Sequence, residues 1–230
     1  MSVDPDPVNL RQPLLFDFQT NSLDTVELFP RVWGAAEALV DPNPQNRQAG
    51  LDCLKESRAA RYSPLIGYLL FTRLSDPDLH LRVNIIDELA NSLSPDDHGQ
   101  FSPEIVRQSL RYYLSQTDQK QLAAMLEAVE LDERIEQAIV LFLKINCNAG
   151  TILVDILTDR KNPVGLRKQA AKFIGMVGIV EATPAIDRLI SRLESRVNGQ
   201  QSFGFNPLDP IDETHLLPTL KDVLASLTAP

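Results

Sequence analysis

The amino-acid sequence predicts an all-α fold in which about five helix pairs stack into a right-handed α-α superhelix, an α-solenoid. Aromatic residues make up only 6% of a chain that is 43% hydrophobic, so the core must consist mostly of Leu, Ile, Val and Ala, which suit close-packed helices. Helix-start signals recur along the chain, with apolar residues spaced three and four apart between them. One stretch of sequence also repeats after 35 residues, as stacked units do.

The helix starts are marked by a capping residue that is followed at once by proline. The side-chain oxygen of the capping residue accepts hydrogen bonds from free backbone N–H groups, and proline at the first helical position has its φ angle preset. Six dipeptides have this form: Asn43-Pro44, Ser63-Pro64, Asp76-Pro77, Ser102-Pro103, Asn162-Pro163 and Thr183-Pro184. With the apolar spacing they predict eleven helices, near residues 24–40, 44–57, 63–74, 77–91, 103–116, 118–129, 132–146, 150–158, 163–177, 183–197 and 213–227.

The internal repeat aligns residues 39–57 with residues 74–92. Seven residues recur unchanged: Leu39, Asp41, Pro42, Arg47, Asp52, Leu54 and Ser57 fall on Leu74, Asp76, Pro77, Arg82, Asp87, Leu89 and Ser92. A looser copy begins at Asn162-Pro163 and leads to Arg167. Between residues 103 and 146 the Asp-Pro signature is missing, which leaves the helix pairing there open and makes 103–116 the candidate for an unpaired helix.

The repeat resembles the HEAT-repeat family, whose units carry an Asp-Pro turn and an arginine six residues after the aspartate. Asp41 with Arg47 and Asp76 with Arg82 fit that spacing. The resemblance implies that these four residues form a structural ladder, in which the planar guanidinium bonds the turn aspartates of neighbouring units. It also implies that five helices line the concave side, at 44–57, 77–91, 132–146, 163–177 and 213–227.

Three segments divide the chain. Residues 24–197 form the repeat solenoid, and residues 1–23 cap its first helix pair. Residues 198–230 hold a long loop, because proline and glycine at their density prevent a helix, and then a capping helix. Phe203 and Phe205 in that loop are candidate contacts for a partner, against the alternative that both rings tuck under the last helix.

Charge and motifs together argue against several functions. Lys and Arg number 22 against 31 Asp and Glu, a net charge of −9, which argues against nucleic acid as a general partner. Neither the histidines nor Cys53 and Cys147 have metal-ligand spacing, so we expect no metal and no cofactor, and we interpret both cysteines, like Trp33, as core residues. A secretory signal and an apolar run long enough for a membrane span are also missing, so we expect a cytoplasmic protein.

A local concentration of cations gives the sharpest functional hypothesis. Arg160, Lys161, Arg167, Lys168 and Lys172 lie within thirteen residues of an acidic chain. Arg167, Lys168 and Lys172 are therefore candidates for binding an acidic peptide or a phosphate, against the alternative of a solvated polar face. A separate stripe on the helix predicted at 183–197 comprises Arg188, Arg192 and Arg196, diluted by acidic neighbours.

The sequence as a whole predicts a non-catalytic adaptor or scaffold that presents its groove to a protein or peptide partner. The identity of the partner, the pathway and the oligomeric state are left open. Two other functions stay in view. Residues 163–197 resemble HEAT-like units of phycobilin lyases, which implies a bilin-lyase-like or other protein-modifying subunit, and HEAT scaffolds also bind nucleic acid. Fold alone does not confer either chemistry.

Overall fold

The structure, a computed structural model, describes residues 30–200 and 213–229, and those residues are helical with short connections. The all-α prediction is confirmed. Three short 3-10 helices accompany the α-helices: η1 (Glu133–Ile135), η2 (Val180–Ala182) and η3 (Glu213–Leu216). The α-helices in the described ranges are α2 (Pro30–Ala38), α3 (Pro44–Glu56), α4 (Ala59–Tyr62), α5 (Pro64–Thr72), α6 (Leu79–Leu93), α7 (Glu104–Ser115), α8 (Gln119–Val129), α9 (Glu136–Ile145), α10 (Ala149–Thr158), α11 (Val164–Val177), α12 (Thr183–Gln200) and α13 (Leu217–Thr228).

Side-chain caps set many of the helix starts. The Asn43 carboxamide oxygen accepts from the backbone N–H of Gln45, and the Ser63 hydroxyl accepts from that of Ile66. Asp118 and Gln121 form a reciprocal capping box at the start of α8, which satisfies two backbone donors at once. Each of these caps holds a helix at a start that the sequence predicts.

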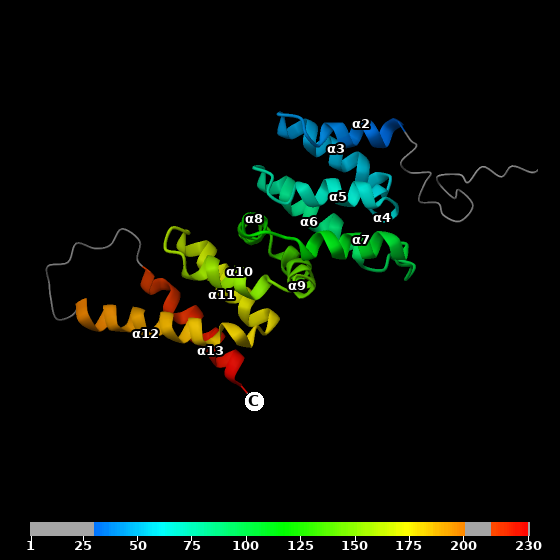
Figure 1. Ribbon diagram of the computed structural model, residues 1–230. Coiled ribbons are helices and arrows are strands. Elements are labelled where there is room, and N and C mark those ends of the chain that lie inside the picture. The colour runs from blue at the N-terminus through cyan, green and yellow to red at the C-terminus, as the bar shows by residue number, and fades with distance from the viewer. Residues whose placement is uncertain (1–29, 201–212, 230) are drawn as a thin grey trace, which may run out of the picture.

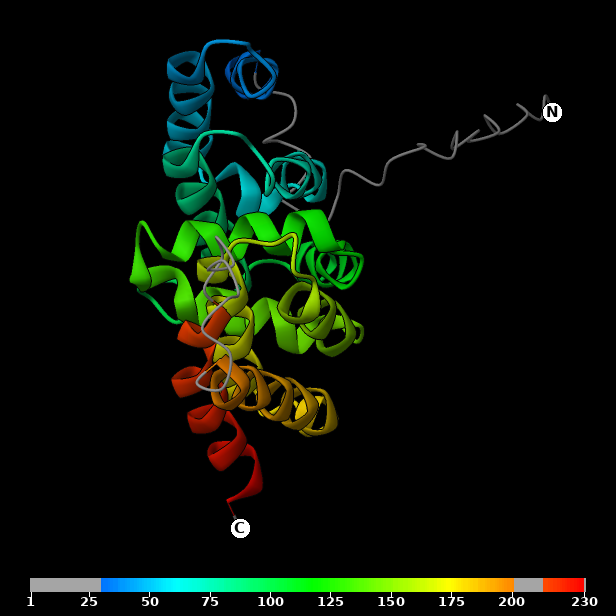
Figure 2. The same cartoon turned by 90° about the vertical axis from the view of Figure 1, so that its left-hand side faces the viewer.

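The helices follow one another in chain order along a stack, so that α2 and α13 lie at opposite ends (Figures 1 and 2). Within the stack, α2 packs on α3, α5 on α6, α10 on α11 and α12 on α13. A row of contacts also runs from α3 to α6, α8, α11 and α13. One apolar core continues through the whole stack, from Val32 in α2 to Val223 in α13.

One expectation for the middle of the chain needs correction. In the row of contacts from α3 to α13, the position expected for 132–146 is taken by α8. The helix at 103–116, the candidate for an unpaired helix, is α7, and it packs against α5 and α9 more than against α8, its neighbour in the chain. The guanidinium of Arg82 in α6 donates to the carbonyl oxygen of Ala124 at 2.7 Å and to the Glu127 carboxylate at 3.0 Å, and both acceptors belong to α8.

Buried arginines connect successive parts of the stack. Arg47 in α3 donates through Nη2 to Asp76 Oδ1 at 2.8 Å, and its Nη1 donates to the carbonyl oxygens of Asp41 and Pro42. The pair links α3 to the turn before α6 and is buried on both sides. Guanidinium groups suit this position because they can serve several acceptors in one plane.

Two of the three residues expected in the core, Trp33 and Cys147, lie at the surface, and Cys53 packs against the core from a half-buried position. Trp33 is 44% exposed because α2 turns Val32 toward the core and leaves the next position on the outer face. Cys147 is exposed because α9 ends before it, and Cys53 is half-buried.

No single helix in the described ranges is long and apolar enough to cross a membrane. The segments Glu133–Ile145 and Ala149–Thr158 pass that test only as a pair, and they meet at a bend of 117°.

Candidate functional site

The most unusual polar cluster is built around Glu213, at the start of η3. Its carboxylate is 5% exposed, and its two oxygens accept from different arginines. Arg167 Nη1 lies 2.7 Å from Oε1, and Arg196 Nη1 lies 2.9 Å from Oε2. Arg167 is fully buried and its Nε donates to the carbonyl oxygen of Leu157. Glu213 therefore ties α11 and α12 to the turn before α13, much as Asp76 ties α3 to the turn before α6.

Two further arginines approach the same carboxylate without reaching hydrogen-bond distance. Arg160 Nε lies 3.8 Å from Oε1 and Arg192 Nη2 lies 3.9 Å from Oε2. These contacts are ion pairs, but at that separation a hydrogen bond is not formed. We call Arg160, Arg167, Arg192, Arg196 and Glu213 the arginine cluster.

The unequal charges shift the pKa values of the cluster. Burial raises the pKa of Glu213, but the hydrogen bond from Arg167 and the charges of Arg167, Arg160 and Arg192 outweigh it and hold the pKa below its ordinary value. Burial lowers the pKa of Arg192, the charge of Arg160 lowers it further, and Glu213 opposes both effects. The Arg192 guanidinium is thus poorly compensated, as expected where like charges gather.

Some buried hydrogen-bond donors of the arginine cluster have no acceptor. Nε and Nη2 of Arg192 are covered by protein and have no acceptor, and the same holds for Nη2 of Arg167. A buried donor without an acceptor is costly and calls for an explanation. The side chains of Arg160 and Arg192 also remain 54% and 39% exposed, so part of each guanidinium can meet a molecule from solution.

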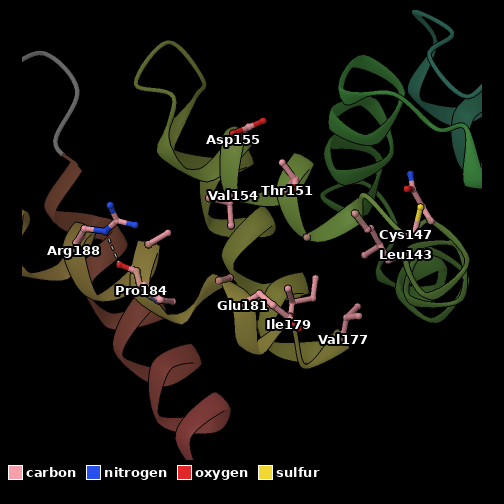
Figure 3. Close-up of a pocket in the computed structure, with 15 residues that line it drawn as sticks. Leu143, Cys147, Thr151, Val154, Asp155, Val177, Ile179, Glu181, Pro184 and Arg188 are labelled. Carbon is pink, nitrogen blue, oxygen red and sulfur yellow. Dashed lines mark hydrogen bonds between the residues drawn. The ribbon is translucent and has the colours of Figure 1, made fainter.

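A groove approaches this cluster along α10 and α12. Its larger part is a cavity of about 660 Å³ (Figure 3), and a second cavity of about 350 Å³ continues it. Val154, Ala185 and Arg188 line both cavities, and Arg192 and Thr158 line the second. We call the two together the α10–α12 groove.

The lining of the groove is mixed, with polar side chains such as Asp155 and Glu181 among the apolar ones and arginines at one end. Leu143 and Cys147 lie at the end far from Arg188, and Val177 and Ile179 lie along the wall (Figure 3). Arg188 donates through Nε to the carbonyl oxygen of Pro184 at 2.9 Å, which fixes the side chain at the entrance to the smaller cavity. The next guanidinium in that direction is Arg192, which belongs to the arginine cluster.

The residues predicted from sequence do not form one surface. Arg167 is buried beside Glu213, Lys172 pairs with Glu136, and Lys168 is half-buried. Phe203 and Phe205 lie outside the described residues. The sequence analysis did not predict that Arg160 lies near the stripe of Arg188, Arg192 and Arg196. The four-residue spacing of the stripe was visible in the sequence, but nothing in the sequence indicated that Glu213 would pair with it.

Other ionisable groups are engaged locally. Backbone N–H groups of Asn43 and Gln100 hold the pKa values of Asp41 and Asp96 below their ordinary range, and the side chain of Arg134 does the same for Asp132. In the described part of the chain, no three His, Cys, Asp or Glu side chains gather as a metal site would require.

Comparisons with known proteins returned no match to a family model, a characterised protein or a solved structure. The site is therefore judged by its own geometry. It offers an open groove with a mixed polar and apolar lining and guanidinium groups at one end, an arrangement that can hold a segment of another molecule.

Proposed function

We propose that the chain is an α-solenoid of HEAT-like helix pairs and a non-catalytic interaction module that binds a segment of a partner protein in the α10–α12 groove. The carrying observation is the groove itself, an open trough of about 660 Å³ with a mixed polar and apolar lining that leads to Arg188 and Arg192. Four helix pairs pack directly, α2 with α3, α5 with α6, α10 with α11 and α12 with α13, and between them α7 packs on α5 and α9 while α8 packs on α6 and α11.

The arginine contacts support the solenoid. Arg47 in α3 reaches the turn before α6, Arg82 in α6 reaches α8, and Arg167 in α11 reaches the turn before α13. Each contact joins one helix of the row from α3 to α13 to the next helix of that row. Such nearest-neighbour linkage is what a solenoid requires, because a single pair cannot bury both of its apolar faces.

The state of the polar groups supports binding rather than catalysis. A general base works best when its pKa lies near the working pH, and the pKa of Glu213 is held below its ordinary value. Both of its oxygens already accept from arginines. Glu88 has a pKa of about 7, but it lies outside the cavities described for these residues. The groove therefore can hold a ligand, and neither of these two carboxylates serves as a general base within it.

The experiment compares capture of partners by groove and control variants. Ala185→Gln places a longer side chain in the floor of both cavities. Ala225→Gln makes the same change at an exposed position of α13 outside them. We expect proteins retained from the native lysate by the unmodified chain to be lost with Ala185→Gln and kept with Ala225→Gln. Retention of the same proteins by all three chains would remove the groove from the proposal.

Two direct assays test the rival functions. Covalent retention of phycocyanobilin with a red-shifted absorbance would replace the proposal with a lyase-like activity. Binding of duplex DNA at about 150 mM salt would replace it with a nucleic-acid function. We expect neither result. Resemblance of a fold does not confer lyase chemistry, and the net charge of −9 repels the phosphate backbone of DNA.

A further inference from the structure

Helix α5 has an apolar sequence on all of its sides, but only part of its surface is covered. None of its nine residues is charged, and a helix that is apolar all round is normally enclosed by protein. Ile66 and Leu70 are buried where α5 packs on α4, α6 and α7. Leu65 and Tyr68 are instead 37% and 45% exposed. Within the described part of the chain, one side of α5 therefore lacks the cover that its composition suits.

Helix α7 continues this apolar side of α5. Ile105 and Tyr112, two turns apart on α7, are 57% and 64% exposed. The ring centroid of Tyr113 lies 5.2 Å from that of Tyr68 and 6.0 Å from that of Tyr112, and both pairs meet edge to face at normal separations. An aromatic row therefore crosses from α5 to α7. We call Leu65, Tyr68, Ile105, Tyr112 and Tyr113 the aromatic face.

The aromatic face carries no charge along either helix. Residues three, four and seven apart share one side of a helix, so Thr72 belongs to the exposed side of α5 and Gln108 to that of α7. Both are uncharged, like the five residues of the face. Glu104 lies at the edge of this side, and Arg107 pairs with it. A connected apolar surface marks a contact site, and this one offers a charged ligand no free counter-charge, so its occupant should be apolar and uncharged.

The chain itself contains a segment of matching chemistry before α2. Residues 1–29 lie outside the described part of the structure, but their sequence includes the uncharged run Gln-Pro-Leu-Leu-Phe at positions 12–16. Large apolar side chains are concentrated there, at Leu14, Leu15, Phe16 and Phe18. Removal of such side chains from water is favourable, and the aromatic face offers them an apolar surface without an opposing charge.

The length of this segment allows it to reach the aromatic face. The segment joins the described chain at Pro30, where α2 begins, and α2, α5 and α7 follow one another on one side of the stack (Figures 1 and 2). Packed helices lie about 10 Å apart, so two steps along this side measure about 20 Å. Phe18 lies twelve positions before Pro30, and an extended chain of that length spans roughly 40 Å. By contrast, Phe203 and Phe205 follow α12, at the other end of the stack.

We propose that residues 12–18 of the chain cover the aromatic face of the same molecule. A segment tethered to its binding surface acts at an effective concentration in the millimolar range, so it fills the face before a free molecule at lower concentration does. This inference is independent of the proposed function, because the aromatic face belongs to α5 and α7 and the α10–α12 groove to other helices. A partner that displaces the segment would uncover the aromatic row.

Crosslinking of the full-length chain tests where the segment lies. In a background with Cys53→Ser and Cys147→Ser, Asp17→Cys is combined with Gln108→Cys, an exposed position of α7, and the protein is treated with a short bis-maleimide. We expect a crosslink within one molecule, identified by mass spectrometry. In the control, Asp52→Cys takes the place of Gln108→Cys. It is exposed on α3, which packs directly on α2, so the segment can reach it as easily. The product with Gln108→Cys should exceed that of the control at least about tenfold.

Each other result of the crosslinking overturns the proposal. A crosslink between two molecules would assign the aromatic face to the segment of a second copy. An equal yield with Asp52→Cys would show that the segment has no preferred place on the stack, and no product with Gln108→Cys would show that it does not cover α7. Thr72→Cys, exposed on α5, replaces Gln108→Cys if circular dichroism shows that the first variant folds poorly, and the same result is expected with it.

Hydrogen exchange gives a second reading that needs no added cysteine. Leu15→Ser with Phe16→Ser removes two apolar side chains from the segment and should raise exchange in α5 and α7 at least about tenfold relative to α11 and α13. Val3→Ser with Val8→Ser makes a matched change outside residues 12–18 and should leave exchange as in the unmodified chain. Equal exchange in α5 and α7 for the two double variants would overturn the proposal, because a face that loses its cover must become more accessible to solvent.

Discussion

Glu88 gives the stability of this protein a dependence on pH that can be worked out from the structure. The residue lies in α6 and is 7% exposed. Burial raises the pKa of its carboxyl group from 4.5 to about 7, a shift that Lys55 and Arg61 reduce and Asp87 increases. The carboxyl group therefore holds a proton in the folded chain at pH values where the unfolded chain has released it.

The sign and size of the effect follow from this difference. Between pH 4.5 and about 7 the folded chain binds more protons than the unfolded chain, so the free energy of unfolding falls as the pH rises through that window. Above about pH 7 the contribution of Glu88 to stability is lost completely. At about 1.4 kcal/mol per pH unit, the shift in its pKa corresponds to a loss of roughly 3 kcal/mol in the free energy of unfolding. Glu88→Gln keeps the shape of the side chain without its charge, so it should be about 2 to 3 kcal/mol more stable than the unmodified chain at about pH 8 and equal to it below pH 4.5.

Urea unfolding followed by far-ultraviolet circular dichroism measures the effect. The midpoint should fall with rising pH for the unmodified chain and much less for Glu88→Gln. Glu37→Gln removes a carboxylate from an exposed position of α2 and serves as the control. Parallel loss of stability in the unmodified chain and in Glu88→Gln would show that Glu88 is not desolvated, and the reasoning would be refuted.

Other predictions concern the packing of the helix pairs. Gly50→Ala would place a Cβ atom 2.7 Å from the backbone carbonyl oxygen of Ala35, so it should separate α2 from α3 and lower the free energy of unfolding by about 1 to 3 kcal/mol in urea. The Cβ atom of Gly67→Ala would meet only the end of a leucine side chain, so this variant should lose less stability than Gly50→Ala. A larger loss for Gly67→Ala than for Gly50→Ala would contradict the close approach of α2 to α3. Arg47→Lys should lower the free energy of unfolding by about 1 to 3 kcal/mol, because an ammonium group cannot donate hydrogen bonds to Asp76 and to two carbonyl oxygens at the same time. A thermal midpoint equal to that of the unmodified chain would show that the planar fork is dispensable.

The helices were predictable because their signals are local. A cap such as Asn43 or Ser63 acts on backbone groups two or three residues away, and the apolar spacing is read within one helix. The short helix α4 was not predicted, because it has only four residues and no capping dipeptide precedes it. Its start is marked only by the positive φ of Arg58, which separates α4 from α3. The same locality explains why the 3-10 turns at η1 and η3 were interpreted as ordinary helix.

The candidate site was less predictable because its pairs are distant in sequence. Arg167 and Glu213 are 46 residues apart, and Glu213 belongs to no Asp-Pro dipeptide, so the repeat pattern gave no reason to join them. Lys172 was grouped with Arg167 because they are close in the chain, but it pairs with Glu136 of α9. The sequence shows that cations are concentrated between residues 160 and 172. Only the packing of α12 and η3 shows that Arg160 and Arg167, among these cations, share the carboxylate of Glu213.

The Glu213 carboxylate joins helices that lie far apart in the sequence. Arg47 and Asp76 form a buried one-to-one pair, whereas Glu213 accepts hydrogen bonds from Arg167 in α11 and from Arg196 in α12. Removing one partner of a buried ion pair leaves the other charge uncompensated, at a cost of about 3 to 5 kcal/mol. Glu213→Gln should therefore raise hydrogen exchange in α11, α12 and α13 more than in α2 and α3, because the arginine that it leaves buried without a counter-charge, Arg167, belongs to α11. An equal rise in exchange along the whole described chain would show that this carboxylate does not act locally.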